Sequence, residues 1–267
     1  GIGCDEIQFN EKTVWTGRPN GIEKKANYGE YRNFGNLYIS HRGIKTDTKI
    51  TDYRRWLDIR NAVAGMTYSI DGVRYDREYI ASSPDRMIAV MLRASGKEKI
   101  NVDLLLKDGN TDYNGTASGT KIDKGNMTFK GKLTYLSYYC RVAVTPYGKK
   151  AKMSINDSAL TITKADSLLV LLSGGTNYST ETANYRTNES VLHQRIDDII
   201  NKALAKNYTT LKTRQQKSHR MLFDRCQLSI TPDDCNTKPT PQLVADYNKT
   251  DSSYLDNHFL EELYFNY

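Results

Sequence analysis

Pairs of carboxylates are the first residues of this sequence that could do acid–base chemistry. Three pairs of acidic residues are adjacent in the chain: Asp5–Glu6, Asp197–Asp198 and Glu261–Glu262. Two carboxyl groups that flank a bond can act as general acid and general base, as in the hydrolysis of glycosides. Neighbours on a strand or a helix, however, point in different directions. We therefore expect these pairs to be solvated surface residues, and their spacing predicts no catalytic pair.

The remaining reactive residues do not have the spacing of a metal or nucleophile site. Neither H-x-x-x-H nor H-x-H occurs among the histidines, and no C-x-x-C occurs among the cysteines: His41, His193, His219, His258, Cys4, Cys140, Cys226 and Cys235. A G-x-S-x-G elbow and a phosphate loop are both absent, and Ser173–Gly175 is expected to be a turn. The sequence therefore predicts no metal and no cofactor. Cys226 and Cys235 could pair, which leaves the redox compartment open.

The charge balance bears on the class of partner. The 267 residues include 38 basic and 31 acidic side chains, a formal net charge of +7, which raises nucleic acid as a partner. The basic residues between Lys206 and Arg225, however, spread along a predicted helix, which is typical of a solvated helix face. Residues 241–267 carry Lys249 among several acidic residues. We expect no nucleic-acid partner.

Hydropathy excludes a membrane-spanning helix from this sequence. The mean hydropathy is −0.65, and the longest apolar runs, Met87–Leu92 and Leu168–Leu172, fall far short of the roughly 20 residues that cross a bilayer. The sequence opens at Gly1 without a basic and apolar leader, so export would require a leader outside it.

The first 185 residues have the pattern of a large antiparallel β-sandwich. The sequence holds 19 tyrosines, a residue that suits half-buried strands and, less specifically, sugar-binding surfaces. Two alternating runs flank Asp71–Gly72, a strong hairpin signal. Further short runs predict strands at 86–93, 100–106, 127–134, 138–145, 151–155, 160–163 and 167–172. Many short strands without a helical period between them indicate a mainly β fold.

Helical patterns follow after residue 185. Apolar residues recur at helical spacing from Val191 to Leu204, behind a cap at Asn188 or Ser190. A second helix is predicted over 209–224, with Leu211, Met221 and Leu222 turned inward.

The sequence after the second helix is expected to return to the sheet before a last helix begins. Gln227–Ile230 is expected to be a returning strand, and Thr231–Pro241 a linker. A last apolar helical stripe runs from Leu255 to Tyr267 without a cap, as though the chain were cut inside a helical domain. We expect domains at 1–185, 186–240 and 241–267.

Several segments of the sequence resemble a known enzyme family. Residues 7–17 contain N-E-x-T-x-W-x-G after an alternating strand, which resembles the hallmark of glycoside hydrolase family 95, the bacterial-type and plant α-L-fucosidases. Further segments resemble family motifs in the same order: Asn33–Tyr38, Thr51–Asp58, Tyr75–Asp85, Ala165–Asp166 and Leu222–Arg225. The glycine-rich strand expected before Cys4 is missing, which puts the pairing of the first strand in question.

The resemblance implies an N-terminal β supersandwich, linker helices and the start of an (α/α)6 barrel that carries the active site. Family members release terminal L-fucose with inversion, and their catalytic residues lie in the barrel. The resemblance thus implies that residues 1–267 contain no catalytic residue. Their role would be to support the barrel and to shape its sugar pocket for a fucosylated oligosaccharide, in a periplasmic or extracellular enzyme.

Four residues of the hallmark are candidates for substrate binding: Asn10, Glu11, Trp15 and Gly17. In one interpretation this loop reaches the mouth of the barrel and Trp15 stacks against the sugar. In the other, Asn10 and Glu11 cap a turn, Trp15 packs in the core and Gly17 adopts a positive φ. Tyr53–Trp56 is expected to be an ion-paired strand edge.

Two alternatives to the fucosidase interpretation remain open. The chain could be an independent carbohydrate-binding module that needs no barrel. The enzyme could also act on another sugar, such as an α-L-galactoside, which differs from a fucoside by one hydroxyl group.

Overall fold

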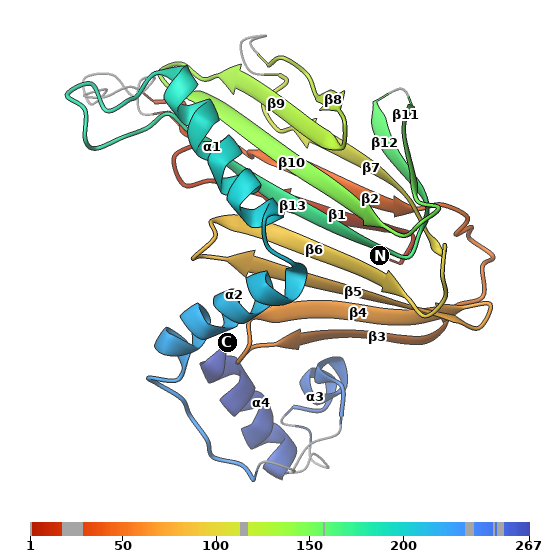
Figure 1. Cartoon of the computed structure of the whole chain (residues 1–267). Coiled ribbons are helices and arrows are strands. Elements are labelled where there is room, and N and C mark those ends of the chain that lie inside the picture. The colour runs from red at the N-terminus through yellow and green to blue at the C-terminus, as the bar shows by residue number, and fades with distance from the viewer. Residues whose placement is uncertain are drawn as a thin grey trace.

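The fold is a sandwich of two antiparallel sheets with helices on one outer face (Figure 1). In this computed structural model, residues 2–17, 29–112, 117–156, 158–232, 238–247, 249 and 254–267 are described. The expected mainly β sandwich is confirmed. Helices α1–α4 all follow the last strand, as the change of pattern after residue 185 predicts.

The smaller sheet has five strands in the order β1-β2-β7-β12-β11. Its strands are β1 (Cys4–Phe9), β2 (Gly35–His41), β7 (Ile100–Asp108), β11 (Lys152–Asn156) and β12 (Ala159–Ala165). β1 pairs along its whole length with β2, so the first strand is present and paired despite the missing glycine-rich segment. It forms one edge of this sheet.

The larger sheet has eight strands in the order β3-β4-β5-β6-β13-β10-β9-β8. Its strands are β3 (Thr51–Asp58), β4 (Val63–Ile70), β5 (Val73–Ser82), β6 (Met87–Ala94), β8 (Lys121–Asp123), β9 (Asn126–Lys132), β10 (Ser137–Tyr147) and β13 (Ser167–Thr176). Asp71 and Gly72 join β4 to β5 with φ of 49° and 74°, as a type I′ hairpin requires. The hairpin prediction is confirmed.

β3 is an edge strand, as expected, but it lacks the expected ion pairs with the residues that the structure describes. It lies at the edge of the larger sheet, as predicted for Tyr53–Trp56. Arg54 and Arg55 are exposed, and neither forms an ion pair with the described residues. Their exposed positive charges disfavour pairing of the free edge of β3 with a strand of another molecule.

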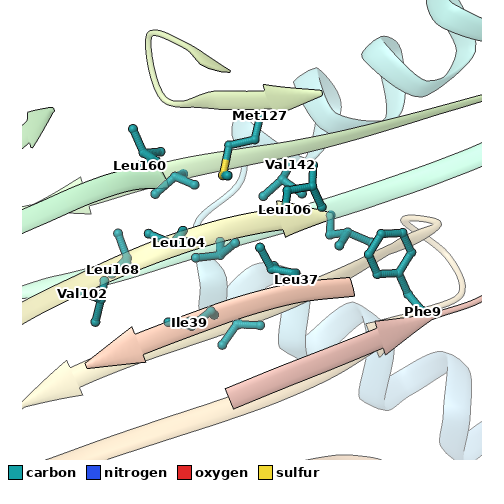
Figure 2. Packing of buried hydrophobic residues seen from close by; sticks show 14 of the residues in the cluster. Phe9, Leu37, Ile39, Val102, Leu104, Leu106, Met127, Val142, Leu160 and Leu168 are labelled. Atoms are coloured by element: carbon teal, nitrogen blue, oxygen red, sulfur yellow. The ribbon is translucent and has the colours of Figure 1, made fainter. Parts of the chain in front are cut away.

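The hydrophobic core lies between the two sheets (Figure 2). Leu37, Leu104 and Leu160 come from the smaller sheet, whereas Val142 and Leu168 come from the larger one, and none is more than 1% exposed. Strand alternation places these side chains on the inner faces of both sheets. Burial of this apolar surface is the main source of the stability of the sandwich.

A buried ion pair joins the two sheets at β1. Asp5 of β1 and Arg77 of β5 form a salt bridge, with side chains that are only 7% and 2% exposed. Asp5 was expected at the surface with Glu6, and that expectation is wrong. The strand alternation turns Asp5 inward onto Arg77, whereas Glu6 points outward and accepts a hydrogen bond from Tyr38.

Helices α1 (Glu189–Leu204) and α2 (Tyr208–Phe223) cover the outer face of the larger sheet (Figure 1). Ile200 and Ala203 of α1 and Leu211 of α2 pack on a second apolar cluster over β5, β6, β10 and β13. Met221 and Leu222, expected to point inward, are 68% and 69% exposed. The buried face of α2 is formed instead by Tyr208, Leu211 and Gln215, a stripe at helical spacing that ends before the last turn.

Three of the six basic side chains between Lys206 and Arg225 form ion pairs with carboxylates of β5 and of the turn after it. Lys206 and Arg214 form ion pairs with Asp85, and Lys212 pairs with Glu78 at 2.7 Å. These pairs attach the helix to β5 and to the turn after it. The expectation of a solvated helix face is wrong for these three side chains.

The segment after α2 corrects another expectation. Gln227–Ile230, predicted as a returning strand, is not part of either sheet. Its backbone is bound by side chains of α4 (Tyr254–Asn266): Asn266 accepts from the nitrogen of Leu228 at 3.1 Å and Glu262 from that of Ile230 at 2.9 Å. Polar side chains of α4 thus satisfy the backbone groups that a sheet would otherwise pair.

The last two helices lie below β3 in the view of Figure 1. α3 (Thr240–Asp246) buries Leu243 and contacts α4. Of the predicted apolar stripe, Leu255, Tyr264 and Tyr267 are 43%, 83% and 84% exposed, whereas Phe259, Leu260 and Leu263 are partly buried. The suggested pairing of Cys226 with Cys235 lies outside the described residues, because Cys235 is not described.

We expect His41 to make the stability of the sandwich depend on pH. Neither ring nitrogen of His41 forms a hydrogen bond with the described residues, and the ring packs edge-on against Tyr75. Burial and the nearby Arg77 lower the pKa of His41. The unfolded chain therefore binds the proton more tightly than the folded one, and stability falls as the pH drops through about 6.5.

The measurement is the melting temperature of the wild type and of His41→Leu between pH 8 and pH 5. The melting temperature of His41→Leu minus that of the wild type should increase as the pH falls. His258→Leu, at a partly exposed position on α4, should show no such gain. A constant difference between wild type and His41→Leu would contradict this account.

Candidate functional site

The loop after β1 carries the hallmark residues and is held by its own side chains. Asn10 follows β1, and its Oδ1 accepts a hydrogen bond from the backbone nitrogen of Phe34 at 3.2 Å. This bond ties the loop to the residue before β2. The Asn10 side chain itself remains exposed.

Glu11 holds the next part of the loop. Its Oε2 accepts hydrogen bonds from the backbone nitrogen of Thr13, at 2.8 Å, and from the Thr13 hydroxyl group. The same hydroxyl group contacts the hydroxyl group of Thr176 at the end of β13. The loop is therefore attached to both sheets. The second oxygen of Glu11 has no hydrogen bond with any described residue.

Asn10 and Glu11 line a pocket at this end of the sandwich. The pocket encloses about 360 Å³ between the end of β1, the residue before β2, the β5–β6 turn and β13. Its lining residues are Phe9, Asn10, Glu11, Phe34, Ala81, Ser82, Ser83, Arg86, Met87, Ile88, Leu172, Ser173 and Gly174. The volume lies in the range of small-molecule sites.

Arg86 is the other charged residue of this pocket. It has a φ of 52°, and its backbone oxygen accepts a hydrogen bond from Ser173 at 2.9 Å, which fixes this turn on β13. Its exposed guanidinium group forms no ion pair or hydrogen bond with the described residues. A guanidinium group, a carboxylate and an amide can bind the hydroxyl groups of a sugar.

The pocket can bind but has no pair of groups for hydrolysis. Glu11 is the one carboxylate among its lining residues, all of which are described. The carboxylate of the nearby Asp85 is occupied by Lys206, Arg214 and Ser82. Hydrolysis of a glycoside requires a second carboxyl group several ångströms away. Among the residues described, no group of three His, Cys, Asp or Glu side chains could hold a metal ion.

Trp15 and Gly17, the other two candidates, lie outside this pocket. Trp15 is half-buried and bridges to Tyr31, with ring centroids 4.6 Å apart. Gly17 is buried and is not among the described glycines with positive φ, contrary to one interpretation. Gly29 has the positive φ, of 73°, and a Cβ there would lie 2.0 Å from the nitrogen of Gly17.

Sequence reasoning missed Arg86 and Ser173. Ser173–Gly175 was expected to be a turn, but it forms the last part of β13. A Cβ at Gly174 would lie 2.4 Å from the Phe34 ring, so the glycine makes room for an aromatic side chain. A glycine pair inside a strand is a signal for such close packing.

None of the helices in the part of the chain that the structure describes is long and apolar enough to cross a membrane.

Comparisons with known proteins give a consistent result. A family model described as "Glycosyl hydrolase family 65, N-terminal domain" matches residues 20–181. The probable alpha-fucosidase A of Aspergillus niger is 24% identical over 238 residues, which cover 86% of this chain and 29% of that protein. Its counterpart in Aspergillus oryzae is 24% identical over 251 residues, covering 90% and 33%. The alpha-L-fucosidase 2 of Arabidopsis thaliana is 27% identical over 125 residues, covering 36% and 15%.

A solved structure shares the fold. A putative kojibiose phosphorylase from the human microbiome has a TM-score of 0.52 at 11% identity, covering 83% of this chain and 31% of that one. The chain thus spans about a third or less of the length of these relatives.

Proposed function

The chain belongs to the family of glycosyl hydrolase family 65 N-terminal domains, whose model matches more than half of it, and from this premise we propose a function. We propose that it is the non-catalytic N-terminal region of an α-L-fucosidase-like enzyme of family 95. In this proposal the whole enzyme hydrolyses terminal α-L-fucosides with inversion. The α-fucosidase names of three relatives support the substrate class.

The pocket at Asn10 and Glu11 is the observation that carries this proposal. The hallmark loop reaches an open pocket, and Glu11 keeps one carboxylate oxygen unoccupied by the described residues. Binding groups without an acid–base pair are what a domain would contribute if it formed one wall of an active site completed by another domain. The fucosylated oligosaccharide would then contact this wall, while the catalytic carboxyl groups come from the barrel.

The proposal includes a division of the chain into three parts. We propose a β supersandwich at 1–185, a linker at 186–240 and the first helix of an (α/α)6 barrel at 241–267. The exposed aromatic side chains of α4, Tyr264 and Phe265, are surface that such a barrel would cover. For an enzyme that acts on external glycans we propose export to the periplasm or the outside of the cell.

Substitution of Glu11 tests the contribution of the pocket. In the protein encoded by the complete source gene, Glu11→Gln should lower kcat/KM for an α-L-fucoside about 10- to 100-fold, mainly through KM. This is the effect of one charge-assisted hydrogen bond of about 1.5–3 kcal/mol. Glutamine keeps an acceptor for Thr13, so the loop should stay folded.

Glu30→Gln is the matched control, because Glu30 is an exposed glutamate that contacts Arg32 outside the pocket. It should leave kcat/KM unchanged. A wild-type kcat/KM for the Glu11→Gln variant would show that the pocket is not part of the active site.

A further inference from the structure

A second pocket lies at the same end of the sandwich, between the β9–β10 turn and the loop that joins β13 to α1. It encloses about 410 Å³, and neither the hallmark loop nor the first pocket contributes to it. Its lining includes Tyr135, Asn177, Arg186, Asn188 and Glu189. Polar side chains dominate this lining, in contrast to the aromatic floor of the first pocket.

Asn177 fixes the two walls of this pocket against each other. Its buried side chain accepts a hydrogen bond from the nitrogen of Ser137 at 2.8 Å and donates one to the oxygen of Thr187 at 2.9 Å. Its backbone pairs with the same two residues, at 2.9 and 2.8 Å. The loop from Asn177 to Thr187 is therefore fixed at both ends, and the pocket is preformed.

Tyr135 and Arg186 form the centre of the pocket wall. The guanidinium carbon of Arg186 lies 4.4 Å above the centroid of the Tyr135 ring, and its Nη1 donates to the oxygen of Tyr135 at 3.2 Å. The hydroxyl group of Tyr135 donates to the oxygen of Asn184 at 2.6 Å. The guanidinium plane is thus held in place. Its remaining N–H groups form no hydrogen bond with the described residues.

Asn188 and Glu189 also present polar groups to this pocket. The side chain of Asn188, the N-cap residue of α1, forms no capping hydrogen bond. One oxygen of Glu189 binds Ser137 and Lys132, at 3.0 Å each, and the other forms no hydrogen bond with the residues that the structure describes. The pocket therefore offers fixed donors and acceptors together, with basic and acidic side chains both present.

The same loop exposes an aromatic pair. The rings of Tyr178 and Tyr185 are parallel within 9°, with centroids 6.5 Å apart, and both side chains are exposed. Tyr185 adopts a φ of 56°, a conformation that costs free energy for a residue with a Cβ. Strained backbone of this kind concentrates at ligand-binding loops.

We propose that this second pocket binds a neutral oligosaccharide. Planar guanidinium, amide and carboxylate groups match the adjacent hydroxyl groups of a sugar, which both donate and accept hydrogen bonds. The mixed charge disfavours a strongly anionic ligand, and the scarcity of apolar lining disfavours a lipid-like one. This inference goes beyond the proposed function, because it gives the chain a ligand of its own that needs no barrel.

The test is an amide NMR titration of residues 1–267 with lactose and with 2′-fucosyllactose. We expect millimolar binding, with shifts confined to residues 132–137 and 177–189. Arg186→Ala should weaken this binding about tenfold or more, and Arg186→Lys, which keeps the charge without the planar fork, should also weaken it. Arg74→Ala, at an arginine of β5 that pairs with Asp76, is the matched control and should bind like the wild type.

Each outcome decides the matter. If Arg186→Ala is not folded, Asn188→Ala takes its place, since the Asn188 side chain forms no capping bond. Shifts at Asn10 and Glu11 alone, or no shifts at 100 mM sugar, would overturn the proposal. Inorganic sulfate that shifts these amides where lactose does not would show an anion site instead. The Glu11→Gln variant should bind these sugars at the second pocket like the wild type. Failure of the second-pocket proposal is therefore distinguishable from failure of the proposed function.

Discussion

The Asp5→Ala variant should lose about 3–5 kcal/mol of unfolding free energy, a large part of the roughly 5–15 kcal/mol of a typical domain. The loss comes from Arg77, which stays buried when its partner is removed. Its side chain is 2% exposed and cannot reach water without disturbing the contact between β1 and β5. A buried charge without its counter-charge is among the most costly defects in a protein.

The surroundings of Arg77 explain why no other group replaces Asp5. Its Nη2 donates to the hydroxyl group of Tyr68 at 2.6 Å and to the oxygen of Ile2 at 3.1 Å. Tyr79 donates to Asp5 at 2.6 Å, and burial and the adjacent Asp5 raise the pKa of Tyr79, so its hydroxyl group remains protonated. These partners are neutral, and in the variant Tyr79 loses its acceptor as well.

Urea unfolding of wild type, Asp5→Ala and Asp76→Ala measures this effect. Asp76 also pairs with an arginine, Arg74, but that pair is partly exposed, so its loss should cost no more than about 1 kcal/mol. Equal, small losses for both variants would mean that the charge of Arg77 is solvated and that the ion pair does not join the sheets.

The Phe34→Ala variant should lose a similar amount, about 3–5 kcal/mol. Phe34 is 1% exposed and lies in an aromatic cluster with Phe9, Phe129 and Tyr138, with centroid separations of 5.5 to 6.0 Å. Its ring also fills the space over Gly174. Removal leaves a cavity that the two rigid sheets cannot close.

Phe34 links this stability to the site, since it also lines the pocket of Asn10 and Glu11. The variant should therefore lose fucoside affinity in the complete protein even at temperatures where it is folded. Phe265→Ala, at a phenylalanine that is 55% exposed on α4, should change the unfolding free energy by less than about 0.5 kcal/mol. A Phe34→Ala variant as stable as Phe265→Ala would show that the cluster repacks.

Local patterns in the sequence predicted most elements of the fold. Asp71–Gly72 fixed the β4–β5 hairpin because few residue pairs adopt two positive φ values in succession. The order of strands could not be predicted in this way. β13 lies between β6 and β10, and β7 between β2 and β12, pairings that depend on contacts far apart in the chain.

The wrong predictions also concern features that depend on contacts between residues far apart in the chain. Met221 and Leu222 fit a helical stripe, but whether a stripe is buried depends on where the sheet ends. Gln227–Ile230 has the composition of a strand, yet Asn266 and Glu262 bind its backbone instead. In each case a distant element determined the outcome.

The candidate site was predictable only in part for the same reason. Asn10 and Glu11 stand in a recognisable motif, and both line the pocket. Arg86 and Ser173 belong to no motif, and only the pairing of β6 with β13 brings them beside each other. Trp15 and Gly17 share the motif but not the pocket, and their role in sugar binding stays a prediction.

The most direct test of the account measures L-fucose release from 2′-fucosyllactose by the product of the complete source gene and by residues 1–267. We expect the complete product to release L-fucose with inversion, and residues 1–267 to fold without releasing any, because their pocket holds one carboxylate. A folded complete product that releases no L-fucose, or hydrolysis by residues 1–267 alone, would contradict the account.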